Sequence, residues 1–528
     1  MERVKLAFRQ RATGRAHGAC HASTGSDNSR HNSGLPGSIE YPPIAIWGIL
    51  VVLTLVAFLL RASHLDGQSL WRDEVDVIRL ASEPVSQLLK NLTLAGHNGP
   101  LYYFLMRGWL NLAGYSEFAL RYLSLCFGVL AVSLVYVVGK RLAGQKTAVL
   151  AAGLAAISPY LVWYSQDAKM YALVTALTLL AMTCLLEALV TSGGRWWVGF
   201  VVFASLSLYI HMLSALMIPV YGAAFLWASP RNSRQWRWGL VAFGLLTLPY
   251  LPLAIWQLPL VLKAHNTGHP FYPLDQMLAL LFNLYARGVA MVGSWVTLAG
   301  YVFAILAGCL LTTGRPARSD LSRDRSSTSL RRVPFLLLIW LVLPIALVYI
   351  VSLRTPIFEP RYLIYLAPAF YLLTASGIVA LSRLSWMATG LALTITLAFS
   401  LLGVWVQAGT PIKSDFRAAA AYVAAHRQNN APIMFQMPYV RHTFDYYYHG
   451  EYIALEGLWT NDGVSQAQVD ERMARLLDGY SEIWLLTSES WLWDSRDLTR
   501  AWLDEHADLI QSASFTLVDV YHYRFERG

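Results

Sequence analysis

Charged side chains are scarce in this sequence. Asp, Glu, Lys and Arg make up only 14% of the 528 residues, and 56% are hydrophobic, whereas a soluble domain carries about 25% charged residues. The mean hydropathy is +0.43. The formal net charge is +9, but many basic residues stand in short segments between apolar runs, so nucleic acid is not expected as a partner. The composition, with 19 Trp and 28 Tyr, is typical of a membrane protein with aromatic residues at both interfaces.

Cysteine pairs, a cleavable leader and internal repeats are also lacking. The four cysteines form no CxxC motif and no Cys/His cluster, so neither disulfides nor a cysteine metal site is expected. Residues 1–42 are basic and rich in Ser, Gly and His, without the apolar core of a secretory signal. We expect this segment to be a disordered cytoplasmic tail. No period of about 20–50 residues and no pair of matching halves is found, which weighs against a transporter built from inverted repeats.

Long apolar runs occupy residues 43–406. A helix that crosses a bilayer needs about 20 mostly apolar residues, and about eleven such runs are predicted to be spans. They lie near residues 43–61, 117–139, 148–164, 170–190, 196–213, 214–229, 238–258, 290–312, 334–352, 361–381 and 386–406. The run at 99–113 carries Arg107 in its middle and predicts instead an amphipathic helix on the membrane surface.

Basic residues mark one side of the membrane. Lys and Arg concentrate in alternate loops, and cytoplasmic loops carry the excess of these residues. They are Lys140, Arg141, Lys146, Arg195, Arg231, Arg234, Arg237, Arg315, Arg318, Arg323, Arg325, Arg331, Arg332 and Arg383. The pattern predicts a multi-pass protein of the plasma (inner) membrane, with a cytoplasmic N-terminus and an extracytoplasmic C-terminus.

Two of the outer regions are long, namely the first loop, residues 62–116, and residues 407–528, where the composition becomes ordinary. In the second region helix-like segments alternate with strand-like ones, which indicates a small α/β domain. The expected helices are Asp415–Arg427, Val469–Asp478 and Leu498–His506, and the expected strands are Pro432–Gln436, Glu482–Thr487 and Phe515–Phe525. The predicted fold class is an α-helical polytopic membrane protein, residues 43–406, with a small C-terminal extracytoplasmic α/β domain.

Acidic residues gather in the outer loops. Asp73, Glu74 and Asp76 follow the first span closely. Because Asp73 and Glu74 are adjacent, their side chains point in different directions, so one can accept a proton while the other fixes the loop. Burial near the membrane would raise the pKa of such a carboxylate and make it a better base. Asp167 lies in a second outer turn. The alternatives are a solvated acidic loop paired with Arg72 and Arg79 and, for Asp167, a favourable position in the first turn of a helix.

Side chains suited to an anion lie in the same outer loops. Arg361 and Tyr362 open a late span, where the backbone N–H groups of a helix N-terminus favour an anion and arginine adds a fork that matches phosphate. Further candidates are Lys263, His265 and His269 in one outer loop and His97 in the first. The alternative is that Arg361 contacts lipid headgroups and that the tyrosines beside His97 anchor the chain at the interface.

Taken together, these segments are similar to those of a known family. An acidic pair, a surface helix introduced by His97, and the segments Ser116–Ser124, Ser158–Leu173 and Glu359–Pro368 follow one another in this order. The order resembles the bacterial GT-C membrane glycosyltransferases of the protein O-mannosyltransferase-like and aminoarabinose-transferase-like group. The similarity covers residues 43–406 and is most specific between residues 69 and 173. In one departure, this chain has His-Asn-Gly-Pro from His97 onward, where many relatives have His-Pro-Pro.

The resemblance implies transfer of a sugar from a polyprenyl-phosphate carrier to an extracytoplasmic acceptor, with inversion at the anomeric carbon. By this resemblance Asp73 corresponds to the base and Glu74 to the second acidic residue of the pair, and Asp167 matches a carboxylate of the second outer loop. The donor phosphate would be bound by Arg361 and Tyr362, with His97, Lys263 and His265 beside them. No cofactor and no metal site are expected, although a divalent metal stays an open alternative.

Several readings remain open at this point. The sugar is a hexose or a pentose, and the acceptor is a glycolipid such as lipopolysaccharide, another cell-envelope glycan or a protein. The rival function is a transporter or flippase of lipid-linked glycans, which predicts ionisable residues near the middle of the spans. A sensor with a membrane anchor is less suitable, because eleven spans far exceed what an anchor requires.

Overall fold

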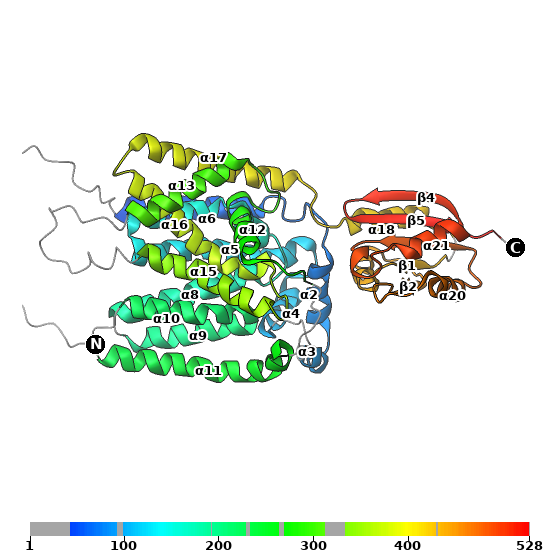
Figure 1. The fold of residues 1–528 in the computed structure, drawn as a ribbon, viewed down its shortest axis with the longest axis horizontal. Coiled ribbons are helices and arrows are strands. Elements are labelled where there is room, and N and C mark those ends of the chain that lie inside the picture. Colours follow the sequence, from blue (N-terminus) through cyan, green and yellow to red (C-terminus); the bar gives the residue numbers. More distant parts are fainter. Residues whose placement is uncertain are drawn as a thin grey trace, which may run out of the picture. The chain divides into compact units, whose positions relative to one another are not determined.

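The computed structural model describes residues 43–91, 99–191, 193–228, 233–262, 269–311, 333–428 and 431–526. In these residues a set of apolar helices comes first and a small sheet with its own helices follows (Figure 1). The chain therefore has the predicted order of a helical membrane region followed by an α/β domain.

The first half of the helical region holds a run of long helices and shorter surface ones. They are α1 (Pro43–Ala62), α2 (Arg72–Ser82), α3 (Val85–Asn91), α4 (Leu101–Ala113), α5 (Glu117–Ala143), α6 (Gln145–Ala156), α7 (Pro159–Ser165), α8 (Tyr171–Thr191), α9 (Gly194–Ile210) and the 3₁₀ helix η1 (Met212–Leu216). The second half comprises α10 (Met217–Trp227), α11 (Ser233–Leu262), α12 (Leu274–Arg287), α13 (Trp295–Leu311), α15 (Val333–Ser352), the 3₁₀ helix η2 (Pro360–Leu366), α16 (Ala367–Leu381) and α17 (Trp386–Gly409).

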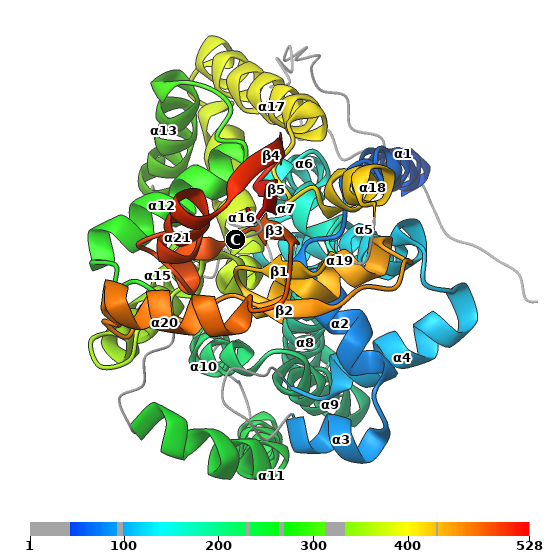
Figure 2. The same cartoon turned by 90° about the vertical axis from the view of Figure 1, so that its right-hand side faces the viewer.

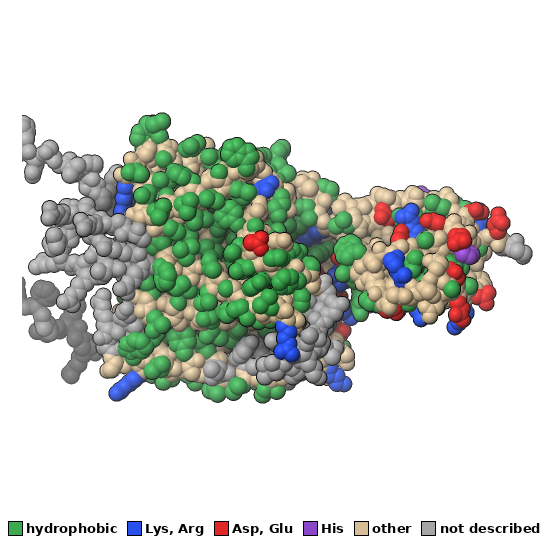
Figure 3. All heavy atoms as spheres, in the orientation of Figure 1, with side chains coloured by type: hydrophobic (Ala, Val, Ile, Leu, Met, Phe, Trp, Pro, Cys, Tyr) green, Lys and Arg blue, Asp and Glu red, His purple; other side chains and the backbone are tan. Residues whose placement is uncertain are grey.

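Apolar side chains cover the outside of these helices. In Figure 3 they spread over the helical region, whereas acidic side chains gather over the sheet. On α1, for example, Val51, Leu55 and Leu59 are exposed, as expected for helices that face lipid. Six helices in the described residues are long and apolar enough to cross a membrane, or seven if the bent pair α6–α7 counts as one span. Three shorter apolar helices accompany them, and the predicted number of eleven spans stays a prediction.

The pair α6–α7 departs from the single straight span expected at 148–164. The two helices are bent by 58° at the break between them, where Pro159 begins α7 and Ser158 accepts a hydrogen bond from the Leu161 N–H. Proline ends the preceding helix because it lacks an N–H group. The fully buried Arg61 of α1 donates to the freed carbonyls of Ala155 (3.2 Å) and Ala156 (2.9 Å). The bend is therefore stabilised by a charged side chain from another helix.

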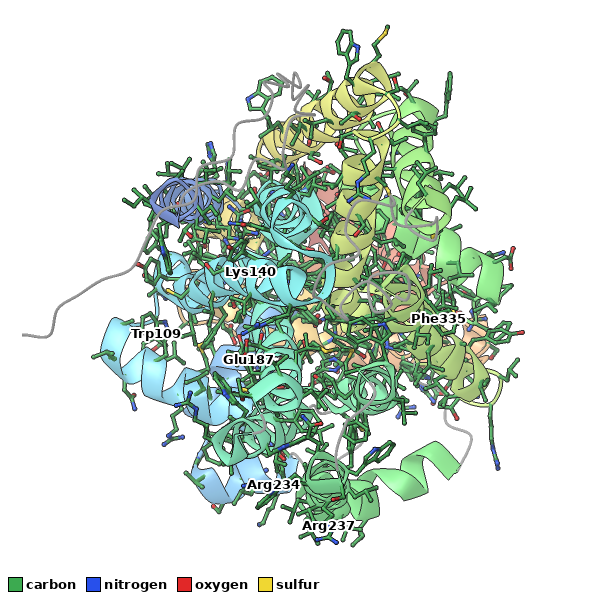
Figure 4. All side chains as sticks on the ribbon, turned by 90° about the vertical axis from the view of Figure 1, so that its left-hand side faces the viewer. Trp109, Lys140, Glu187, Arg234, Arg237 and Phe335 are labelled. Atoms are coloured by element: carbon green, nitrogen blue, oxygen red, sulfur yellow. The ribbon has the colours of Figure 1, made fainter. Side chains whose placement is uncertain are left out.

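Helices α5 and α8 pack against each other, and an ion pair joins them near their C-terminal ends. Arg141, near the end of α5, donates to Glu187 of α8 at 2.6 and 2.8 Å. Figure 4 views the helices from this end and labels Glu187 with Lys140, Arg234 and Arg237. A 27-residue helix such as α5 is about 40 Å long. Lys140 and Arg141, two of the basic residues expected on the cytoplasmic side, thus lie about the length of a span away from the start of α5.

The sheet has five strands in the order β2-β1-β3-β5-β4. Its strands are β1 (Ile433–Phe435), β2 (Ala454–Glu456), β3 (Glu482–Thr487), β4 (Asp508–Phe515) and β5 (Val518–Arg524). The first three are parallel, β5 is antiparallel to β3, and β4 is antiparallel to β5. The connecting helices are α18 (Phe416–His426), η3 (Pro438–Val440), α19 (Arg441–Tyr447), α20 (Gln466–Leu476), η4 (Ser490–Leu492) and α21 (Leu498–His506).

Helices cover both faces of this sheet. Phe416 and Val423 of α18 and Phe444 of α19 share one core with alternate strand residues. Val469 of α20 and Trp502 of α21 belong to a second core with the remaining ones. Because side chains alternate along a strand, each face has its own core. The predicted segments Glu482–Thr487 and Leu498–His506 are confirmed as β3 and α21, whereas β2, β4 and α19 were not predicted.

Candidate functional site

Glu74 is the most enclosed member of the predicted acidic pair. It lies in the first turn of α2 and is fully buried. Arg121 of α5 donates to both of its carboxylate oxygens at 2.8 Å. The Lys413 Nζ lies 2.9 Å from Oε2, and the Ala168 N–H donates to Oε1 at 2.9 Å. Burial alone would raise the pKa of Glu74, but the charges of Arg121 and Lys413 outweigh it and hold this pKa far below its usual range.

Arg121 also fixes the loop that leads into α2. Its guanidinium donates to the carbonyls of Leu65 (2.9 Å), Gln68 (2.8 Å) and Ser69 (3.0 Å). The planar fork of arginine suits such a set of acceptors. Glu74 and Arg121 together therefore connect the first turn of α2 to the loop that precedes it.

Asp167 lies in the turn between α7 and α8 and faces the same cluster. Its Oδ1 accepts from the Trp71 indole N–H at 3.0 Å and lies 3.3 Å from the Lys413 Nζ. Its Oδ2 has no hydrogen-bond partner among the described residues. Burial raises the pKa of Asp167 and the neighbouring Glu74 adds to the rise, against the opposing charge of Lys413. The predicted carboxylates Glu74 and Asp167 thus share one cation.

Asp73 points to a different set of partners. Its Oδ2 lies 3.1 Å from the Arg361 Nη1, and both side chains are about one-fifth exposed. Burial would raise the pKa of Asp73, but the positive charges of Lys169, Arg361 and Arg72 outweigh burial and lower it. The rise in pKa expected from burial is therefore wrong for Asp73, because three cations surround it. The structure brings Asp73 and Arg361 together although 288 positions separate them in the sequence.

Aromatic rings enclose Arg361. Its guanidinium carbon is 5.0 Å from the centre of the Trp71 ring and 5.9 Å from that of Tyr362. The Arg361 Nε has no hydrogen-bond partner in the described part of the chain. The His211 ring lies 5.3 Å from Tyr362, is buried, and likewise has both nitrogens without a partner among the described residues. The site thus keeps nitrogen groups available beside the Asp73–Arg361 pair.

The remaining candidates have different outcomes. His97, Lys263 and His265 lie outside the described residues. His269 Nδ1 is 3.9 Å from Glu359, which in turn lies 3.6 Å from Arg361. Among the residues that the structure describes, no three His, Cys, Asp or Glu side chains are grouped closely enough to hold a metal ion.

Comparison with solved structures identifies the fold of this chain. Residues 97–256 match the model of the dolichyl-phosphate-mannose-protein mannosyltransferase family. ArnT from Cupriavidus metallidurans, solved with bound undecaprenyl phosphate, is similar with a TM-score of 0.54 and 13% identity, covering 90% of this chain and 98% of that one. The chain has the GT-C glycosyltransferase fold.

Two further GT-C structures from Archaeoglobus fulgidus agree with this assignment. Its oligosaccharyltransferase tethered to an acceptor peptide is similar with a TM-score of 0.55 and 12% identity, covering 92% of this chain and 74% of that one. The same organism's AglB, in complex with an inhibitory peptide and a dolichol-phosphate, gives a TM-score of 0.54 at 13% identity over 90% and 74% of the two chains. No curated protein matches in a comparison of sequences.

Residues after α17 also reach the site of this GT-C fold. The Gln68 side chain accepts from the N–H groups of Ile412 and Lys413, at 2.9 Å each. Tyr447 of α19 accepts from the Leu70 N–H at 2.6 Å. Together with the Lys413 ammonium between Glu74 and Asp167, these contacts join the sheet domain to the loop before α2.

Sequence reasoning missed Arg121, Lys413 and Trp71 as members of the site. A signal for Arg121 was present, because a lone arginine in the apolar run of α5 requires a buried acceptor. Lys413 opens the segment after the last span, and nothing local in the sequence links it to Glu74. The Trp71 indole links Asp167 to Arg361, which depends on the tertiary fold alone.

Proposed function

We propose that this protein transfers a hexosyl or pentosyl group from a polyprenyl-phosphate carrier to an extracytoplasmic acceptor, with inversion. The acceptor hydroxyl oxygen attacks the anomeric carbon and its proton passes to Asp73. The bond from that carbon to the carrier phosphate breaks, and the phosphate leaves with the electron pair. The observation that carries this proposal is the Asp73–Arg361 pair at 3.1 Å, which sets a carboxylate beside a cation suited to phosphate.

Arg361 is assigned to the phosphate of the carrier. Its guanidinium sits in the 3₁₀ turn that opens α16, with Glu359 3.6 Å from its Nε but no hydrogen bond to that atom among the described residues. A cation there stabilises the negative charge that grows on the leaving phosphate. The polyprenyl and dolichyl phosphates bound in the ArnT and AglB structures support a lipid-phosphate donor. Tyr362 is placed beside it, and His97, Lys263 and His265 remain further proposed donors.

Donor binding would also raise the pKa of Asp73. Without donor, Arg361 and two other cations stabilise the charged carboxylate and weaken it as a base. A bound phosphate competes for the Arg361 charge, so the pKa of Asp73 rises in the donor complex. Asp73 thus becomes a stronger base when the substrate it acts on is present.

Transport of a lipid-linked glycan is the second reading, and the positions of the charges favour it less. The buried carboxylates Glu74 and Asp167 stand at helix starts and turns, and Arg121 lies in the second turn of α5. A transporter requires ionisable residues near the middle of its spans. Lys413 and Arg121 already neutralise Glu74, which disfavours a divalent metal at the acidic cluster.

We place the site on the outer face of the plasma membrane. A reporter enzyme that is active only outside the cytoplasm, fused after Phe525, should be active, because the basic loops mark the other side. The same reporter fused at Gly144, between α5 and α6, should be silent and serves as the control. Activity of a strictly cytoplasmic reporter at the C-terminal position would overturn this orientation.

Replacing Arg361 should weaken the use of donor. For Arg361→Ala we expect an increase in the donor KM or Kd of about 10- to 100-fold, because a hydrogen bond to a charged group contributes about 1.5–3 kcal/mol. Arg361→Lys should recover part of the loss, since it keeps the charge but not the fork. Binding is measured with a radiolabelled polyprenyl phosphate in vesicles. The control is Arg354→Ala, an exposed arginine nearby; equal binding by wild type and Arg361→Ala would reduce Arg361 to a contact with lipid headgroups.

A further inference from the structure

The three parallel strands of the sheet domain end on one common edge. β1 lies between β2 and β3, so the chain leaves β1 toward one neighbour and later returns to the other side of it. Such a change of direction is a topological switch point, and in open α/β sheets ligands bind outside the carboxyl ends of the strands there. The segments that follow β1, β2 and β3 therefore form the expected binding edge of this domain.

Aromatic residues are concentrated in these three segments. Tyr439 follows β1, Trp459 follows β2, and Trp491 and Trp493 follow β3. The Trp493 ring contacts Trp459 and Tyr439, with ring centres 4.6 and 5.9 Å apart. Trp491 is 61% exposed, Tyr439 52% and Trp459 41%. We call these four residues the aromatic platform; soluble domains rarely expose such rings together unless they bind a partner.

Neutral polar groups border the aromatic platform. The Asn461 amide donates to the Trp491 carbonyl at 3.1 Å and its oxygen accepts from the Ser495 N–H at 2.8 Å. Both residues are exposed. Hydroxyl and amide groups at the rim of an aromatic surface provide hydrogen bonds to a ligand that lies flat on the rings.

The aromatic platform is joined to the proposed catalytic helix. Glu489, two residues before Trp491, lies 2.8 Å from Arg72, and Arg72 precedes Asp73. The backbone of Glu489 is left-handed, with φ +53°, a conformation that non-glycine residues rarely adopt and that is enriched at functional sites. In addition, α19 packs against α2 (Figure 2). A ligand on the platform would thus lie next to the residues that carry the reaction.

We propose that the aromatic platform binds a sugar ring of a saccharide acceptor, so that the acceptor of this enzyme is a glycan or the glycan of a glycolipid. This inference rests on the proposed function and narrows its acceptor. One face of a pyranose ring carries only C–H groups and packs on aromatic rings, while its hydroxyl groups hydrogen-bond to the rim. The platform consists of aromatic rings, of which Trp459 and Tyr439 each meet Trp493 edge-on. Neutral amides and hydroxyls border it, which suits a neutral sugar better than an extended peptide.

Saturation-transfer NMR on the full-length protein in nanodiscs tests the proposal. The probe is the pool of oligosaccharides released by mild acid from the envelope glycolipids and polysaccharides of cells that produce the protein. We expect saturation of carbon-bound ring protons by the wild type. Trp491→Ala and Trp459→Ala should each weaken binding about 10-fold, as loss of a stacked aromatic does, whereas Trp491→Phe should retain most of it.

The matched control is Trp386→Ala, because Trp386 is 82% exposed at the start of α17, away from the sheet; it should bind like wild type. No saturation by the wild type, or equal binding by Trp491→Ala, would overturn the proposal. A second measurement tests whether the exposed tryptophans contact the membrane instead of a sugar. In ¹⁹F NMR of fluorotryptophan-labelled protein with headgroup spin-labelled lipid, broadening of the Trp491 signal would show that Trp491 anchors the domain to the membrane and would overturn the proposal.

The same experiment separates this inference from the proposed function. Asp73→Asn protein should bind the oligosaccharides like wild type, because Asp73 is assigned to proton transfer and the aromatic platform to binding. If Asp73→Asn also keeps normal turnover, the proposed base is wrong while the platform stands. If instead the turnover of Asp73→Asn falls while Trp491→Ala binds oligosaccharide and transfers sugar normally, the proposed role of the platform is wrong and the proposed function stands.

Discussion

Purified Asp73→Asn protein should transfer sugar about 100- to 10,000-fold more slowly than wild type, the range that general-base catalysis contributes. Asparagine keeps the size and hydrogen-bonding shape of the side chain but cannot accept the proton. Turnover in vesicles is the measurement, with expression and donor binding recorded alongside. Folding should survive, because Asp73 is at the edge of the site and not within the buried cluster of Glu74.

The control for this variant is Asp76→Asn, because Asp76 lies on the same helix and pairs with Arg79 at 3.2 Å on the surface. It should keep turnover near that of wild type. The pH dependence gives a second check. Since the pKa of Asp73 is lowered without donor and should rise when phosphate takes Arg361, the acidic limb of kcat should lie at higher pH than that of kcat/KM. Near-normal turnover of Asp73→Asn would move the base to Asp167, whose raised pKa and unpartnered Oδ2 make it the next candidate.

Removing Arg121 should destabilise the protein by about 3–5 kcal/mol, the cost of leaving a buried charge without its partner. In Arg121→Met, Glu74 loses two of its hydrogen bonds and three loop carbonyls lose their donor. Glu74→Gln should also be strongly destabilising, since Arg121 and Lys413 then face a neutral amide. Thermal unfolding in detergent is the measurement.

Arg475→Met provides the comparison for Arg121→Met, because Arg475 forms an exposed i,i+4 pair with Glu471 on α20. This variant should leave the unfolding temperature unchanged.

The dependence of stability on pH has a definite sign. The folded-state pKa of Glu74 is depressed, so its contribution to stability is present above the ordinary glutamate pKa and is lost as the pH falls through the folded-state value. Unfolding of Arg121→Met at the wild-type temperature would show that the Glu74 cluster contributes little.

Much of the membrane region is predictable because hydropathy is a local property. The spans around 43–61, 170–190 and 386–406 correspond to α1, α8 and α17 with only small differences at their ends, as expected when an apolar run alone determines the helix. The bend at Pro159 was missed because the run 148–164 stays apolar across it. In the sheet domain, β1 and β2 are each three residues long, which is too short for an alternation of apolar and polar residues to identify them. The strand β1 was predicted because it lies within the apolar segment Pro432–Gln436.

In the site, too, some features can be predicted from the sequence and others depend on the tertiary fold. Asp73, Glu74, Asp167 and Arg361 are recognisable because charged residues are scarce in this chain and these four stand together with the segments that resemble the family, and the fold brings all four to one end of the helices. Which carboxylate faces which cation depends on contacts between residues hundreds of positions apart. Lys413 reaches Glu74 across 339 positions, and no local pattern in the sequence indicates that pairing.

The hydrogen bonds of Arg61 have a consequence for how the protein is made. Apart from the Ala57 carbonyl of its own helix, its acceptors lie on α6 and α7, and the most distant in sequence, Ser165, is 104 residues later in the chain. A ribosome adds about 5–20 residues per second, so about 5 to 20 s pass between the synthesis of Arg61 and that of its last partner. During this interval the Arg61 guanidinium has only the Ala57 carbonyl of α1, water and lipid headgroups as acceptors. Insertion of α1 is therefore completed by a helix pair that does not yet exist when α1 enters the bilayer.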